Sequence, residues 1–175
     1  MSANAGYFVG STGATANTIC PSGSYSQQYG AISCTSAPLG TFCSTTGLTF
    51  FSLCSAGSYA ASIGLSACTL APAGFYVIGG GSSVSAPCAV GSFSNAVGAT
   101  ACTLTSPGMY SLGGSIQAAC AGNTYSAGYG NSVCTGCASG YYSNSGASVC
   151  IIITASPTLG PTAMPSTSLP TPIPG

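Results

Sequence analysis

Cysteine and tyrosine are the only side chains in this sequence that can titrate. The chain has eleven Cys and ten Tyr among 175 residues, and it has no Asp, Glu, Lys, Arg or His. General acid–base catalysis needs a side chain whose pKa lies near the working pH, and a Ser or Cys nucleophile needs a neighbouring base. The sequence supplies no side-chain base, so we expect no enzymatic activity and no catalytic residue.

The absence of charge also excludes several classes of partner. Binding of calcium or magnesium relies on carboxylates, and binding of nucleic acid relies on Lys and Arg. We therefore expect no metal, no cofactor and no nucleic-acid partner. The longest aliphatic run is Ile151–Ile153, far below the roughly 20 residues of a membrane span. A chain with zero net charge lacks the repulsion that keeps proteins apart, which favours self-association.

A 17-residue repeat runs through most of the chain. Some units begin with a Cys, as in Cys54-Ser-Ala-Gly57-Ser-Tyr59, and the units between them lack it, so that the two kinds make a 34-residue super-repeat. Tetratricopeptide repeats share that length, but Gly, Ser and β-branched residues interrupt any helical periodicity here. The glycine that anchors each unit lies at positions 6, 23, 40, 57, 74, 91 and 108, is replaced by Asn123, and returns at 140.

Each unit has the pattern of a small β-hairpin. In Gly91–Cys102 an aromatic residue follows the anchor, a second Gly marks a turn, and a β-biased segment leads out. We expect two strands of about three to four residues around that turn. One such hairpin is marginal alone, so it must be stapled and stacked, with consecutive aromatics forming a thin core. The predicted fold is all-β: about nine disulfide-stapled hairpin repeats over residues 1–150, stacked into an elongated rod.

Cysteine spacing suggests local disulfides. Pairing each Cys with the one thirteen or fourteen positions ahead closes loops of about 15 residues, each contributing roughly 3 kcal/mol. Spacing alone leaves the connectivity open. Cys43 is then left over, and a buried thiol is favoured over an intermolecular bond or a partner in another segment. The favoured pairs are Cys20 with Cys34, Cys54 with Cys68, Cys88 with Cys102, Cys120 with Cys134, and Cys137 with Cys150.

Three weaker motifs have other interpretations. Cys134-Thr-Gly-Cys137, with Cys120 and Cys150, could hold zinc, although two adjoining disulfide loops explain the spacing better. Gly79–Gly81 could suggest a phosphate loop, but no Lys and no helix pattern follow it. The Tyr and Phe residues are expected first in the core and second as a platform for stacking carbohydrate.

The repeat resembles a known family. The pattern Cys-x-x-Gly-x-[Tyr/Phe]-Ser followed by Gly-Ala-x-x-Cys, with the Cys134–Cys137 junction, is similar to ephrin-receptor-like cysteine-rich repeats, which are distantly similar to tumour-necrosis-factor-receptor modules. The resemblance covers residues 1–150. It implies an extracellular, disulfide-stapled rod, as in large surface and flagellar-hair (mastigoneme-like) proteins. Most unit boundaries here lack Cys-x-x-Cys and the chain lacks charge, which points to the structural members rather than to receptors.

The composition changes after Cys150. Residues 151–154 are expected to form an apolar strand, and 155–175 a Pro/Ser/Thr-rich polyproline II tail; a disordered linker to a further domain is the alternative. The chain has no Asn-x-Ser/Thr sequon, so any glycan would be O-linked. The candidate sites are Ser156, Thr158, Thr162, Ser166, Thr167, Ser168 and Thr171.

These features predict a structural subunit of an extracellular filament or cell-surface appendage. The partners would be further copies of the chain and its own glycans, with Ile151, Ile152 and Ile153 as the head-to-tail contact. The alternative is a fragment of a cell-surface receptor or adhesin that acts as a binding module. Residues 1–6 show no secretory signal, so we expect that a signal has been removed or that the chain is a segment of a longer product.

Overall fold

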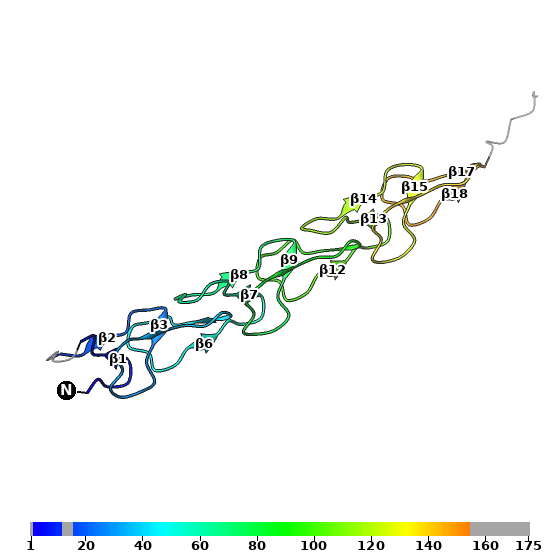
Figure 1. Cartoon of the computed structure of the whole chain (residues 1–175). Helices are drawn as coiled ribbons and strands as arrows, with labels where there is room; N and C mark the ends of the chain where they lie inside the picture. The colour runs from blue at the N-terminus through cyan, green and yellow to red at the C-terminus, as the bar shows by residue number, and fades with distance from the viewer. Residues whose placement is uncertain (1, 12–15, 155–175) are drawn as a thin grey trace, which may run out of the picture.

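Nine antiparallel β-hairpins make up the part of the chain that the computed structural model describes, residues 2–11 and 16–154. No helix occurs within these residues, and Figure 1 shows the hairpins following one another along one elongated axis. The paired strands are β1 (Tyr7–Phe8) with β2 (Thr18–Ile19), β3 (Ser24–Tyr25) with β4 (Thr35–Ser36), β5 (Thr41–Phe42) with β6 (Ser52–Leu53), β7 (Ser58–Tyr59) with β8 (Thr69–Leu70), β9 (Phe75–Tyr76) with β10 (Ala86–Pro87), β11 (Ser92–Phe93) with β12 (Thr103–Leu104), β13 (Met109–Tyr110) with β14 (Ala118–Ala119), β15 (Thr124–Tyr125) with β16 (Thr135–Gly136), and β17 (Tyr141–Tyr142) with β18 (Ile151–Ile152).

The anchor residue of each repeat lies directly before the first strand of its hairpin and has a positive φ. The anchor glycines have φ values such as 82° at Gly6 and 83° at Gly140. Asn123, the one substitute for Gly in the series, has φ 65° and is the only non-glycine with positive φ among the described residues. Asn is one of the few residues that tolerate this left-handed conformation, which explains why the repeat accepts it.

Backbone hydrogen bonds join each hairpin to the next. The N–H of Gly6 donates to the carbonyl of Ser26 at 2.8 Å, and the N–H of Gly23 donates to that of Cys43 at 2.8 Å. A further bond spans two hairpins, as from the N–H of Gly47 to the carbonyl of Cys20 at 2.8 Å. The pattern recurs along the chain, so the backbone itself holds the repeats together.

The anchor glycines allow this close stacking. A Cβ built on Gly40 would lie 2.0 Å from the carbonyl oxygen of Gly81, a turn glycine two hairpins further on. A Cβ built on Gly6 would lie 2.3 Å from the carbonyl oxygen of Gly47, and one built on Gly108 would lie 2.0 Å from that of Gly146. No side chain fits in that gap, so glycine is required by space as well as by φ.

The core is a narrow column of small side chains and half-cystines. We call the residue three positions before each anchor the core residue. All but the last of them are buried, and half-cystines alternate with Ala or Thr along the series: Ala3, Cys20, Ala37, Cys54, Ala71, Cys88, Thr105 and Cys120, followed by the partly exposed Cys137. Apart from the partly exposed Val9, the residues three positions after the anchors form a second buried row, mostly Ser.

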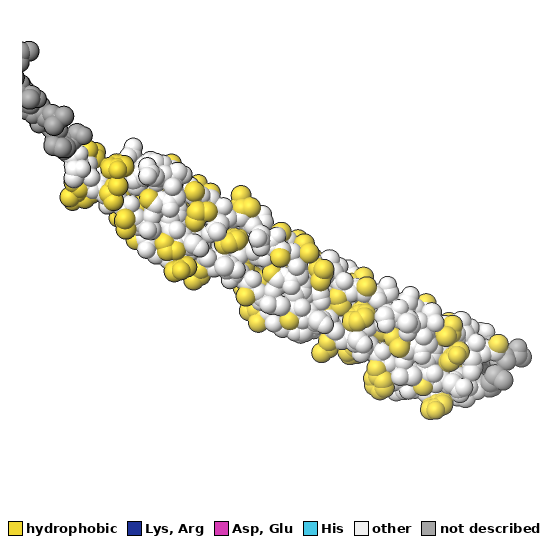
Figure 2. All heavy atoms as spheres, turned by 180° about the vertical axis from the view of Figure 1, so that it is seen from behind, with side chains coloured by type: hydrophobic (Ala, Val, Ile, Leu, Met, Phe, Trp, Pro, Cys, Tyr) yellow, Lys and Arg dark blue, Asp and Glu magenta, His cyan; other side chains and the backbone are white. Residues whose placement is uncertain are grey.

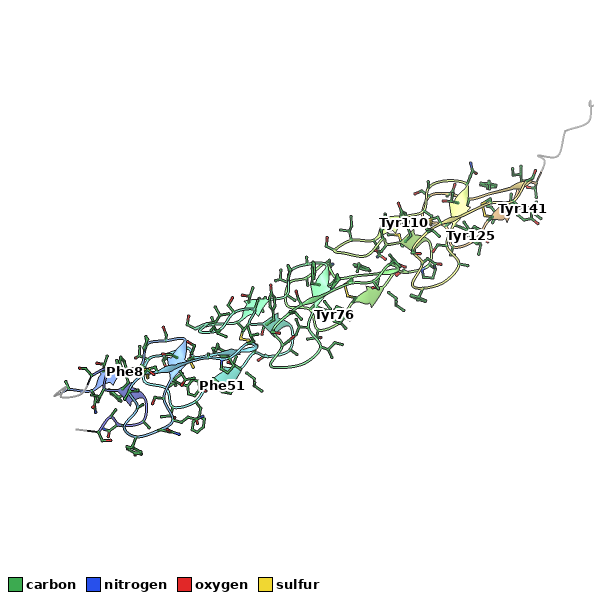
Figure 3. All side chains as sticks on the ribbon, viewed as in Figure 1. Phe8, Phe51, Tyr76, Tyr110, Tyr125 and Tyr141 are labelled. Carbon is green, nitrogen blue, oxygen red and sulfur yellow. A yellow bond between two sulfur atoms is a disulfide. The ribbon has the colours of Figure 1, made fainter. Side chains whose placement is uncertain are left out.

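Two sequence predictions about the hairpins are wrong in detail. The strands have two residues each rather than three or four. The aromatics do not form the core: Tyr25 and Tyr76 are half-buried and Tyr142 is exposed. Figure 3 shows the labelled rings spread singly along the molecule, and Tyr25 with Phe51, at 5.5 Å between ring centroids, is the ring pair found within the described residues. The hairpins approach too closely for large rings to enter between them.

The arrangement recurs every third hairpin. In Figure 1, β2, β8 and β14 follow one another along the upper edge of the molecule, and β6, β12 and β18 follow one another along the lower edge. Over most of the chain, every second hairpin carries a disulfide. The two periods differ, so the disulfide-bearing hairpins do not all lie on one side.

Candidate assembly surface

Five disulfides close the hairpins that carry a Cys before the second strand. Their sequence separations are 14, 14, 14, 14 and 13, and each has a Cα–Cα distance of 5.7 Å. Every one joins a core residue to the residue directly before the second strand of the following hairpin. The pairs are the ones that the spacing favours: Cys20–Cys34, Cys54–Cys68, Cys88–Cys102, Cys120–Cys134 and Cys137–Cys150.

This pairing leaves no thiolate at the Cys134–Cys137 junction to hold zinc, because both residues and their neighbours Cys120 and Cys150 are in disulfides. Within the described residues, no group of three or more Cys or other metal-ligating side chains gathers. Gly79–Gly81 lies in the turn of hairpin β9–β10, where Gly81 has φ 75°.

Cys43 is a free, buried thiol. It lies three positions after its anchor, in the row occupied by Ser26, Ala60, Val77 and Ser94 in other hairpins, and it is 0% exposed. Burial raises the pKa of the Cys43 thiol above its ordinary value. A buried neutral thiol is a poor nucleophile, so Cys43 acts as a small apolar side chain.

The last described hairpin, β17–β18, ends in three exposed isoleucines. Ile151 and Ile152 form β18, and Ile153 follows it. The N–H of Ile153 donates to the carbonyl of Gly140 at 2.9 Å, as that of Cys20 does to Gly6. Ile153 therefore occupies the position of a core residue. It is nevertheless 59% exposed, whereas Cys20 and Ala37 are 0% exposed, because no described hairpin stacks beyond it.

Backbone groups at this end are also open. Every earlier anchor donates its N–H to the next hairpin, but Gly140 has no backbone acceptor within residues 2–11 and 16–154. The same holds for the N–H of Ser143, and the carbonyl of Cys137 lacks the donor that the carbonyls of Cys20 and Cys120 have. The end thus presents an incomplete stacking face with both apolar and hydrogen-bonding character.

Sequence reasoning selected the three isoleucines but missed their different roles. Ile151 and Ile152 correspond to strand residues such as Thr18 and Ile19, which are exposed in other hairpins too. Only Ile153 falls in the core series. Counting from the anchor could have found it: Ile153 is thirteen residues after Gly140, and Cys20 is fourteen after Gly6, in a hairpin one residue longer.

Exposed apolar side chains are scattered over the remaining surface. Figure 2 shows them as separate groups along the length of the molecule rather than as one continuous patch. Four of them precede the turn glycine of disulfide-bearing hairpins: Tyr29, Ile63, Val97 and Tyr129. Figure 2 shows no charged side chain, in keeping with the sequence.

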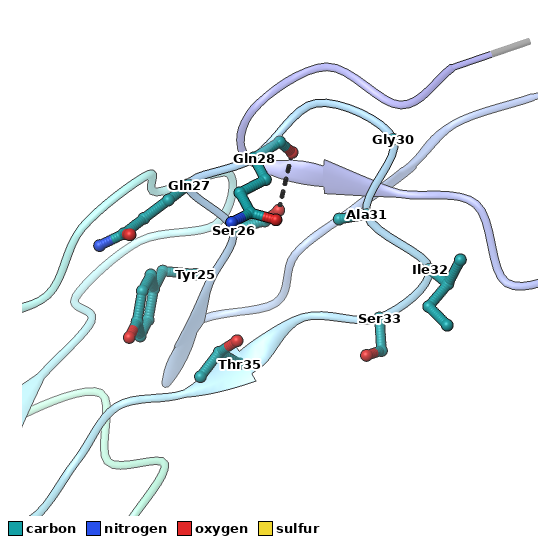
Figure 4. A pocket seen from close by; sticks show the side chains of 9 residues that line it. All are labelled: Tyr25, Ser26, Gln27, Gln28, Gly30, Ala31, Ile32, Ser33 and Thr35. Carbon is teal, nitrogen blue, oxygen red and sulfur yellow. Dashed lines mark hydrogen bonds between the residues drawn. The ribbon is translucent and has the colours of Figure 1, made fainter.

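A polar hollow lies within hairpin β3–β4. It has a volume of about 410 Å³ and is lined by uncharged groups, among them Tyr25, Gln27, Gln28, Ser33 and Thr35. Figure 4 shows both glutamines on the loop above Tyr25, where the hydroxyl of Ser26 donates to the carbonyl of Gln28. Such a lining can exchange hydrogen bonds with a neutral polar ligand, but it holds no acid or base.

No protein-family model and no curated protein matches this chain. A helix able to cross a membrane is absent from the described residues. The O-glycan candidates Ser156 to Thr171 and the whole tail 155–175 lie outside the residues that the structure describes.

Proposed function

We propose that this chain is a structural subunit of an extracellular filament that assembles by stacking of hairpins between molecules. The observation that carries the proposal is the incomplete face at β17–β18, where Ile153 is exposed in a position that is buried in eight earlier places along the chain. An exposed apolar core position with open backbone donors favours the addition of another copy. A head-to-tail contact does not close on itself, so it generates a filament.

Two further features support an extracellular role. Five disulfides fit an oxidising compartment. An uncharged chain with a mean hydropathy of +0.51 needs another hydrated layer, which O-linked sugar on Ser156, Thr158, Thr162, Ser166, Thr167, Ser168 and Thr171 would supply. Intact mass tests this: we expect added sugar above the 16.7 kDa polypeptide, and a bare mass would contradict it.

Electron microscopy of purified protein tests the assembly. We expect wild-type chains to form regular filaments and the Ile153→Asp variant to remain single rods, because a carboxylate cannot enter an apolar core position. The matched control is Ile63→Asp, since Ile63 is 65% exposed on the side of hairpin β7–β8. Isolated rods in the wild type, or filaments of normal length in Ile153→Asp, would contradict the proposal.

The hollow in hairpin β3–β4 favours a second candidate function, the binding module of a cell-surface receptor or adhesin. Its amides and hydroxyls can both donate and accept, and Tyr25 adds a ring against which a sugar could stack, so a neutral saccharide is the fitting ligand. Titration with neutral oligosaccharides, followed by NMR, tests this. Binding that disappears in Gln27→Ala/Gln28→Ala but survives in Gln117→Ala would support it, and no binding to any member of the series would reject it.

A further inference from the structure

The disulfides show which residues face each other where the chain enters a hairpin. Each disulfide joins a core residue to the residue directly before the second strand of the following hairpin, as in Cys20–Cys34, with 5.7 Å between the Cα atoms. In hairpins without a disulfide, other residues fill the two positions. At the first hairpin, β1–β2, they are Ala3 and Asn17. At the other end, Ile153 is a core residue with no following hairpin among the described residues.

Asn17, which takes the place opposite Ala3, carries a buried polar atom. The side-chain oxygen Oδ1 of Asn17 is buried and has no hydrogen-bond partner among the described residues, and it is the only such side-chain atom found there. A buried unpaired polar atom costs about 1–3 kcal/mol.

Residues of the second strand also contact the turn two hairpins further on. A Cβ on Gly47 would meet Cδ1 of Ile19 at 3.0 Å, and one on Gly81 would meet Cδ2 of Leu53 at 3.2 Å. At Gly30 the corresponding atom is Oγ of Ser2, at 3.2 Å. Ser2 thus occupies a place that Ile or Leu takes in other hairpins, and Ile152 is the residue of β18 that corresponds to it.

On the basis of the filament proposed above, we propose that the β17–β18 end of one molecule continues onto β1–β2 of a second copy in the register used within the chain. Residues 152–154 take the place of residues 2–4 of the second copy. Ile152 then covers the turn at Gly30 and Ile153 fills the core position of Ala3, opposite Asn17. Two isoleucines replace Ser2 and Ala3, so the exchange buries more apolar surface.

Hydrogen bonding is complementary in this register. Each anchor donates to the carbonyl three residues after the next anchor, as Gly6 does to Ser26. Gly140 would donate to Val9 of the second copy. Within the described residues, the carbonyl of Val9 accepts no backbone hydrogen bond outside the strand pairs. Among the described residues, a donor without a backbone acceptor at one end thus meets an acceptor without such a donor at the other.

Cysteine cross-linking tests the register in the full chain. In a Cys43→Ser background, which removes the free thiol and matches Ser26 and Ser94, the N17C/I153C variant should form a ladder of covalent oligomers on a non-reducing gel. Position 17 directly precedes β2 and position 153 directly follows β18, and these strands lie at opposite ends of the molecule (Figure 1), so a bond within one chain is excluded. An equal mixture of the N17C and I153C single variants should stop at dimers, because each chain then carries one reactive end.

The matched control is N17C/I152C, in which the second cysteine points to the other face of its strand. Its cross-linking should not exceed that of the single variants, and mass spectrometry of the native disulfides checks that each variant folds. If the Cys43→Ser parent forms filaments but N17C/I153C gives no ladder, or no more than the control, the register is wrong and the filament stands. If the parent forms no filaments and N17C/I153C no ladder, both are wrong.

Discussion

Neighbouring hairpins β5–β6 and β7–β8 have the same backbone but different cores. In both, the first residue of one strand pairs with the last residue of the other, Thr41 with Leu53 and Ser58 with Leu70. Their anchors lie equally close to the turn two hairpins further on. A Cβ built on Gly40 would lie 2.0 Å from the nearest carbonyl oxygen of that turn, and one built on Gly57 would lie 2.2 Å from it. Only β7–β8 is closed by a disulfide. The glycines and backbone bonds set the shape, and the disulfide adds stability to a shape that does not depend on it.

The largest effect is expected from the anchor glycines, and it should be the same in both kinds of hairpin. Gly40→Ala and Gly57→Ala each force a Cβ into a backbone carbonyl at positive φ, so we expect a loss of at least about 4 kcal/mol in the free energy of unfolding, or failure to fold. Gly140→Ala is the matched control in the unassembled chain: no described atom lies within 4 Å of its Cβ, so only the φ cost of about 1–2 kcal/mol applies. Denaturant unfolding measures all three. A tolerated Gly40→Ala would show that close stacking does not determine the fold.

Removal of one disulfide should have the next largest effect. Cys54→Ala/Cys68→Ala opens a loop with a sequence separation of 14 and should cost about 3 kcal/mol. Amide hydrogen exchange should show the bonds of β7–β8 still formed, with protection closer to that of β5–β6. Complete loss of protection across residues 57–71 would mean that this hairpin, unlike its neighbour, needs its cross-link to fold. The protein has no Lys or Arg, so trypsin has no cleavage site, and peptide analysis of the exchange uses an acid-active protease.

A smaller effect is expected from a buried hydroxyl in a hairpin without a disulfide. The hydroxyl of Ser111, after β13, lies 2.8 Å from the carbonyl of Ile116 and accepts from the N–H of Gly113 at 3.2 Å. Ser111→Ala leaves these groups unpaired and should cost about 1–2 kcal/mol. Ser106→Ala, at an exposed position directly before the same hairpin, should change stability by less than about 0.5 kcal/mol. Equal effects of the two changes would show that the buried hydroxyl of Ser111 adds nothing to the stability of this hairpin.

The smallest effect concerns pH. Because burial raises the pKa of Cys43, the folded chain holds the thiol proton more tightly than the unfolded chain does. The protonated thiol makes its full contribution to the free energy of unfolding below the ordinary thiol pKa, and this contribution is lost as the pH rises through the raised pKa. The midpoint temperature of thermal unfolding should therefore fall more steeply at alkaline pH for the wild type than for Cys43→Ser. Parallel curves for the two proteins would mean that the thiol reaches solvent.

The sequence predicts the repeat better than it predicts the core. Anchor spacing and cysteine pairing follow from local patterns, and Asn123 could be recognised as a substitute for glycine because both residues accept positive φ. The place of the aromatics could not be recognised, because it depends on how closely one hairpin stacks on the next. Gly40 and Gly81 are far apart in sequence but lie close together in the structure. Because this close approach leaves little space between the hairpins, the small Ala37 rather than Phe42 fills the interior. The different exposure of Ile153 and Cys20 has the same origin.

The alternation of cross-linked and open hairpins gives the molecule a specific response to tension. A disulfide such as Cys54–Cys68 keeps its Cα atoms 5.7 Å apart even after the hydrogen bonds of the hairpin have broken. The stretch between Cys34 and Cys54 has no such limit and can lengthen to roughly 3.3–3.6 Å per residue. Under load, the open hairpins extend first and the closed loops remain short. A chain pulled from both ends would thus yield in steps of about one hairpin, with an extension limited by its sulfur bridges.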